Sequence, residues 1–252
     1  MILLALLELR DVSKVYSDEG RSITVLDGVS FSVAEEEFVC LVGPSGCGKS
    51  TLLRMVAGLD QVTSGRILYD GRPVTGVDPH IAVVFQSFAL FPWLTVSQNV
   101  ELGLEARRVE PAVRRRLTDK YIDQVGLDGF EEAYPRELSG GMKQRVGIAR
   151  ALAVEPRLLC MDEPFSALDA LTAQNLREEV LSLWADPALK VSSIIMVTHG
   201  IEEAVFMADR IVTFSARPGR VIEILPVPLS RPRNRKDETF QRLTDQVYSL
   251  IV

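Results

Sequence analysis

Residues 43–50 (GPSGCGKS) limit what this chain can fold into more than any other segment. They fit the pattern G-x-x-x-x-G-K-[ST], in which glycines let successive backbone N–H groups point at phosphate oxygens. The apolar run Phe38–Val42 precedes the loop and predicts a strand buried on both faces, and a helix is expected over residues 49–58. A buried strand, a glycine-rich loop and a helix N-terminus in this order predict a P-loop in an α/β fold.

Composition is typical of a globular chain. Of 252 residues, 47% are hydrophobic and 25% are charged, and the net charge of -6 argues against a surface built to coat nucleic acid. Cys40, Cys47 and Cys160 match neither a zinc spacing nor an even set of disulfides, so reduced thiols are expected. No apolar run approaches the ~20 residues that span a bilayer, and residues 1–7 are interpreted as leading into a buried first strand.

Apolar and polar residues alternate over residues 6–16 and 23–33, which predicts two antiparallel strands joined by a turn at 18–20. Further strands are expected at 67–69, 81–85, 157–161, 192–197, and near Ile211 and Val221, and helices at 139–152, 170–184, from Ile201 and from about Glu238. Buried strands that alternate with helices predict a mainly parallel sheet.

Helical spacing with many arginines over residues 96–134 predicts an inserted helical subdomain. We place it at about 94–155, inside a domain of residues 1–225, with a short tail at 226–252 that ends in a helix. The basic runs at 107–108, 114–116 and 231–236 are surrounded by acidic residues and are interpreted as solvated faces.

The P-loop is expected to bind phosphate through its backbone and through Lys49, which reaches the β- and γ-phosphates, while the Ser50 hydroxyl ligates Mg²⁺. The binding residues are Gly43, Pro44, Ser45, Gly46, Cys47, Gly48, Lys49, Ser50 and Thr51.

Asp162 and Glu163 follow the second buried strand, and strand ends of a parallel sheet converge on the ligand crevice. Asp162 suits Mg²⁺ binding, and Glu163 suits a general base. Ser139 is a good N-cap, and Gly140 and Gly141 after it leave backbone N–H groups exposed. That segment predicts either a second anion site or a plain capped helix, and the residues alone favour neither.

The order of P-loop, Gln86 after a strand, LSGGM at 138–142, LLCMDE at 158–163 and a lone His199 resembles the ATP-binding-cassette (ABC) ATPase family, over about residues 7–220. The resemblance implies that Tyr16 stacks on adenine, although a half-buried strand tyrosine is the alternative. It also implies that Gln86 senses Mg²⁺ and the attacking water, that Glu163 is catalytic and that His199 contacts the γ-phosphate.

The resemblance further implies a homodimer that closes head to tail on two MgATP. Ser139, Gly140 and Gly141 of one subunit would cover the ATP held by the other, and Asp169 would lie in the loop that crosses the interface.

Two residues depart from the family pattern. Met142 replaces a glutamine, and Gly200 replaces an acidic residue after His199, which we expect to loosen the following helix.

Four aromatic residues lie within residues 85–100, and Phe91 and Trp93 are interpreted as a groove for a permease helix, with local core as the alternative. Together with SARPGR at 215–220 and LSRPR at 229–233, this segment resembles the nitrate, sulfonate and taurine importer branch. The branch implies transmembrane permease subunits, an extracytoplasmic solute-binding protein, a peripheral position on the cytoplasmic face of the inner membrane and no nucleic acid partner. The alternatives are a soluble ABC ATPase acting on ribosomes or DNA, and a non-catalytic ATP switch, against which Glu163 and His199 argue.

Overall fold

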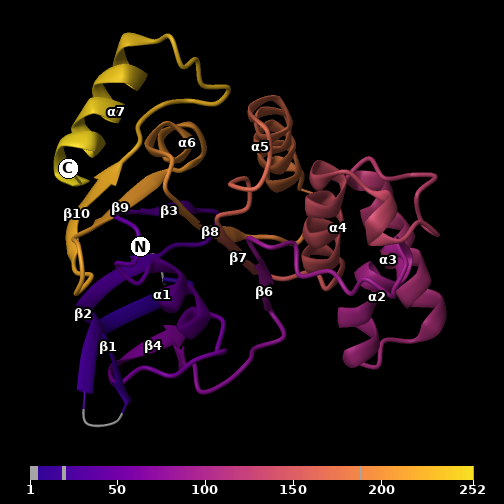
Figure 1. Cartoon of the computed structure of the whole chain (residues 1–252), viewed down its shortest axis with the longest axis horizontal. Coiled ribbons are helices and arrows are strands. Elements are labelled where there is room, and N and C mark those ends of the chain that lie inside the picture. Colours follow the sequence, from indigo (N-terminus) through magenta and orange to yellow (C-terminus); the bar gives the residue numbers. More distant parts are fainter. Residues whose placement is uncertain (1–4, 19–20, 188, 252) are drawn as a thin grey trace. The chain divides into compact units, whose positions relative to one another are not determined.

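The computed structural model describes residues 5–18, 21–187 and 189–251. The chain divides into two compact units, the first formed by Met1–Asp78 with Ser193–Val252 and the second by Pro79–Ser192 (Figure 1). Among the described residues, no helix combines the length and the apolar character that crossing a membrane requires.

The first unit contains an antiparallel sheet in the order β2-β1-β4-β5. Its strands are β1 (Leu7–Asp18), β2 (Arg21–Val33), β4 (Ser64–Tyr69) and β5 (Arg72–Pro73). The two strands expected from alternation are confirmed as an antiparallel pair. Residues 19 and 20 of the expected turn lie outside the described residues.

The same unit contains parallel strands around the P-loop. Strand β3 (Phe38–Val42) is buried at every position and pairs in parallel with β8 (Ser193–Thr198) and β9 (Arg210–Phe214), and β10 (Val221–Pro226) pairs with β9 in the antiparallel direction. The continuous apolar run therefore forms the buried strand that the sequence predicts.

Three helices complete this unit: α1 (Lys49–Val56), α6 (Ile201–Met207) and α7 (Glu238–Ile251). Helix α7 packs beside α6 (Figure 1) and buries Phe240 and Val247. The interpretation of the basic run at 231–236 as solvated is wrong for Arg233, which is 8% exposed. Its guanidinium donates to carbonyls at the end of α6, which a sequence pattern does not reveal.

In the second unit, β6 (Ile81–Val84) pairs in parallel with β7 (Leu158–Asp162). The helices are α2 (Val96–Ala106), α3 (Pro111–Gln124), the 3-10 helix η1 (Pro135–Glu137), α4 (Gly140–Ala153) and α5 (Ala170–Ala185). Helices α2, α3 and α4 pack on one another (Figure 1), so the helical character expected for this part of the chain is confirmed.

Candidate nucleotide site

The P-loop between β3 and α1 is shaped by glycines. Gly46 and Gly48 have φ of 74° and 103°, a region that L side chains rarely adopt. A Cβ at Gly48 would lie 2.8 Å from Leu26 Cδ2 and 2.9 Å from Val25 Cγ1. The loop therefore keeps its backbone directly at the N-terminus of α1, where N–H groups and the helix dipole favour an anion.

Lys49 supplies the positive charge of this loop. The side chain is 4% exposed, and Nζ donates to the carbonyls of Gly43 at 2.7 Å and Pro44 at 2.9 Å. The ammonium is thus held against the loop backbone, and this combination of a cation with a glycine cradle fits a phosphate chain.

Residues 215–220, far from the P-loop in the sequence, pack against it. Gly219 N–H donates to the Val25 carbonyl at 2.8 Å, and Arg217 Nε donates to the Gly46 carbonyl at 3.3 Å. In the sequence, this segment contributed to the resemblance to one importer branch, and its contact with the P-loop was not predicted. The glycine at 219 is the signal that a close backbone approach leaves in a sequence.

Tyr16 presents an exposed ring, 46% accessible, on β1. Its hydroxyl donates to Asp60 Oδ2 at 2.7 Å, and Lys14 Nζ lies 4.7 Å from the ring centroid. The bond to Asp60 raises the pKa of Tyr16. Burial opposes ionisation of Asp60, but hydrogen bonds from Lys14 and Tyr16 outweigh it and lower the pKa of Asp60. The ring is therefore anchored at its hydroxyl, and this anchoring suits a stacking platform.

His199 is exposed between β8 and α6. Before it, the Thr198 hydroxyl accepts the Gly200 N–H at 2.9 Å and donates to the Glu203 carboxylate. A Cβ at Gly200 would lie 3.1 Å from Glu203 Cβ, closer than side chains usually approach. Thr198 and Glu203 therefore connect the residue before His199 to the first turn of α6. These bonds oppose the loosening of the helix start that we expected from Gly200.

In the second unit, Gln86 and Glu163 lie together although 77 residues separate them. Strands β6 and β7 run in parallel, with Val84 opposite Met161. Gln86 and Glu163 each come two residues later, so both lie at the carboxyl ends of these strands. Gln86 Nε2 donates to Glu163 Oε2 at 3.2 Å and to Ser166 Oγ at 3.3 Å. Glu163 has φ of 47°, a strained conformation of the kind that clusters at functional sites.

Residues 138–142, the Ser139 turn, lie beside residues 166–169, the Asp169 loop, in this unit. Ser139 Oγ accepts the Met142 N–H at 3.3 Å as the N-cap of α4. Asp169 caps α5, and hydrogen bonds from the hydroxyl and amide of Thr172 lower the pKa of Asp169. A Cβ at Gly141 would lie 2.5 Å from Thr172 Cγ2, so the glycine permits this close packing.

Phe91 and Trp93 form an exposed pair. Their ring centroids are 5.5 Å apart in an edge-on arrangement, and the side chains are 38% and 69% exposed. This exposure favours a contact surface over local core.

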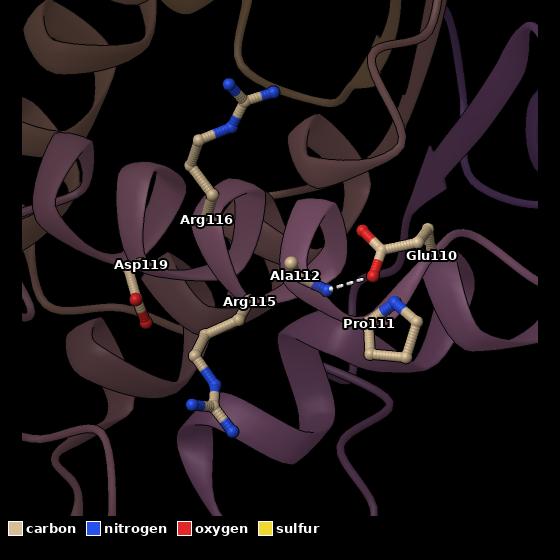
Figure 2. A pocket seen from close by; sticks show the side chains of 6 residues that line it. All are labelled: Glu110, Pro111, Ala112, Arg115, Arg116 and Asp119. Atoms are coloured by element: carbon tan, nitrogen blue, oxygen red, sulfur yellow. Dashed lines mark hydrogen bonds between the residues drawn. The ribbon is translucent and has the colours of Figure 1, made fainter.

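A hollow of about 590 Å³ beside α3 is separate from all these residues. Figure 2 shows Arg115 and Arg116 pointing away from each other and Glu110 capping the helix. The Glu110 carboxylate accepts the N–H groups of Ala112 and Val113 at 3.1 Å, so it already satisfies the helix N-terminus.

Known proteins resemble this chain over most of its length. The ABC transporter family model matches residues 26–166. An ABC transporter ATP-binding protein of Methanocaldococcus jannaschii is 44% identical, with 97% of this chain and 91% of the relative covered. The nitrate import ATP-binding protein NrtD of Synechocystis is 45% identical over 97% and 94% of the two chains. The aliphatic sulfonates import ATP-binding protein SsuB of Bacillus subtilis is 45% identical over 94% and 90%.

A solved dimeric ATP-binding cassette in a post-hydrolysis state with ADP and phosphate has a TM-score of 0.77 and 32% identity, and covers 89% of this chain and 100% of its own. This likeness in fold confirms the expected α/β architecture. The chain belongs to the ABC transporter family, as an ATP-hydrolysing subunit.

Proposed function

We propose that this ATPase is the motor of an importer and closes head to tail as a homodimer on two MgATP to drive uptake of a small solute. The observation that carries the chemistry is the hydrogen bond from Gln86 to Glu163 at the end of β7. It places an amide beside a carboxylate, which is the arrangement needed to orient a water and take its proton.

Each site residue has a role in this proposal. Tyr16 stacks on adenine, Lys49 and the P-loop amides hold the phosphates, and His199 contacts the γ-phosphate. Glu163 accepts the proton of the water that attacks the γ-phosphate, and the bond to ADP breaks. The donor oxygens of Ser50, Gln86 and Asp162 are hard ligands that fit Mg²⁺, which would neutralise charge on the β- and γ-phosphates.

The second copy supplies what one copy lacks around the γ-phosphate. Ser139, Gly140 and Gly141 of that copy would cover the nucleotide, and Asp169 would lie at the interface. ATP would therefore stabilise the closed dimer, and hydrolysis would release it. Phe91 and Trp93 are the proposed contact with a permease at the cytoplasmic face of the membrane.

The solute is proposed as a small oxyanion, because two relatives are named for nitrate and sulfonate import. A permease and an extracytoplasmic solute-binding protein would select it, so no residue of this chain is assigned to it.

Glu163→Gln tests the catalytic assignment. We expect kcat to fall by about 10²–10⁴-fold with ATP binding retained, since the amide cannot take the proton. Exposed Glu132→Gln in the same unit is the matched control. Normal turnover in Glu163→Gln would remove Glu163 from the reaction.

Capture of tagged chain from detergent-solubilised membranes of its source tests the importer role. We expect a permease to be recovered with wild-type chain and lost with the double variant Phe91→Ser, Trp93→Ser. Recovery of ribosomal or DNA-binding proteins instead would move the chain to the soluble class of ABC ATPases.

A further inference from the structure

The backbone directly after Gln86 is bent into an unfavourable conformation. Phe88 and Ala89 have φ of 62° and 48°, and neither is glycine. Two consecutive left-handed residues with side chains persist where neighbouring groups hold them. The turn that they form sets where the chain goes after Gln86, so whatever holds it also affects the position of Gln86.

One side chain holds both residues of this turn. Arg150 Nη2 donates to the Phe88 carbonyl at 2.9 Å, and Nη1 donates to the Ala89 carbonyl at 2.6 Å. Arg150 lies in the last turn of α4, the helix that begins after Ser139. The planar guanidinium matches two adjacent carbonyls, which a lysine cannot do with the same geometry.

The following residues are held from α2. Asn99 is fully buried; its Oδ1 accepts the Phe91 N–H at 2.9 Å, and Nδ2 donates to the carbonyls of Phe91 at 3.2 Å and Leu94 at 3.0 Å. The segment from Gln86 to Leu94 is thus fixed by Arg150 near its start and Asn99 near its end. The exposed pair Phe91 and Trp93 lies within the part that Asn99 holds.

We propose that Arg150 is a positioning residue, which fixes the turn at Phe88 and Ala89 and thereby keeps Gln86 on Glu163. Arg150 also ties this turn to helix α4. Arg150 touches no reacting group itself. The inference rests on the proposed role of Gln86 in hydrolysis.

Arg150→Ala in the full chain tests this, with kcat, KM for ATP and amide hydrogen exchange over residues 86–91 as readouts. We expect kcat to fall about tenfold, because misplacement of a positioned group by about 1 Å costs up to 10²-fold. KM should stay within about twofold, since Lys49 and Tyr16 are held by contacts in the other unit. Exchange over residues 86–91 should become faster, and Arg150→Lys should recover part of kcat.

Arg107→Ala is the matched control, because Arg107 also donates to two backbone carbonyls of the second unit, those of Pro79 and Val154. Unchanged kcat and exchange in Arg150→Ala would overturn the inference, as would an equal loss of kcat in Arg107→Ala. If wild-type chain hydrolysed no ATP, the proposed function would fail, and exchange over residues 86–91 would still decide whether Arg150 holds the turn.

Discussion

At the scale of single residues, the P-loop depends on a glycine far away in the sequence. A Cβ at Gly219 would lie 2.1 Å from the Cys47 carbonyl oxygen, a distance that forces one backbone to move. The Gly219 carbonyl also accepts the Asp27 N–H at 3.1 Å, so the segment cannot shift away without losing that bond. The close approach of Gly219 therefore helps to set the shape of the P-loop.

Gly219→Ala is expected to weaken ATP binding about tenfold, or about 1.4 kcal/mol, because moving the Cys47 carbonyl displaces the backbone of the P-loop that holds the phosphates. Titration calorimetry with ATP measures this. Gly76→Ala in the same unit is the control, since nothing lies within 4 Å of its Cβ position. Equal affinities in the two variants would show that the close approach has no effect on the loop.

At the scale of elements, α6 depends on the chain that follows it. Its Ile201–Met207 span is too short to be stable alone. Arg233 donates to the carbonyls of Val205, Phe206 and Ala208 at 2.8, 3.2 and 2.6 Å, and to Leu229 at 3.0 Å. Burial lowers the pKa of Arg233 to about 10. The tail arginine thus satisfies the end of the helix that follows His199.

Arg233→Ala is expected to lower the free energy of unfolding by about 2–3 kcal/mol, because buried carbonyls lose a charged donor. Urea unfolding measures it, and Arg242→Ala on α7 is the control. The Arg242 side chain is 70% exposed, so its removal should cost less than about 0.5 kcal/mol. A similar cost for both variants would contradict the capping role.

The elements that sequence patterns predicted best are those with local signals. Continuous apolar runs identified β3 and β7, and Ser139 marked the start of α4. Strand β5 and the 3-10 helix η1 were missed because two or three residues carry no periodicity. The contacts of Arg150 and Arg233 were missed because a side chain that reaches a distant carbonyl leaves no pattern along the chain.

At the scale of the whole molecule, the expected site residues are divided between the two units. The first unit carries Tyr16, the P-loop and His199, and the second carries Gln86, Asp162, Glu163 and the Ser139 turn. The family resemblance implied separate roles for Gln86 and Glu163, but their hydrogen bond was not predicted, since 77 residues separate them. In the proposed dimer each copy offers one P-loop and one Ser139 turn, so a head-to-tail arrangement gives two equal sites.

The most direct test of the head-to-tail dimer is the mass of the Glu163→Gln chain in solution, measured by light scattering with and without MgATP. We expect twice the 27.9 kDa of the chain with MgATP and the single-chain mass without it, because unhydrolysed ATP bridges the two copies. Adding Ser139→Glu should keep the mass at 27.9 kDa by placing a negative charge against the γ-phosphate. A Glu163→Gln chain that binds MgATP and stays at the single-chain mass would contradict the head-to-tail motor.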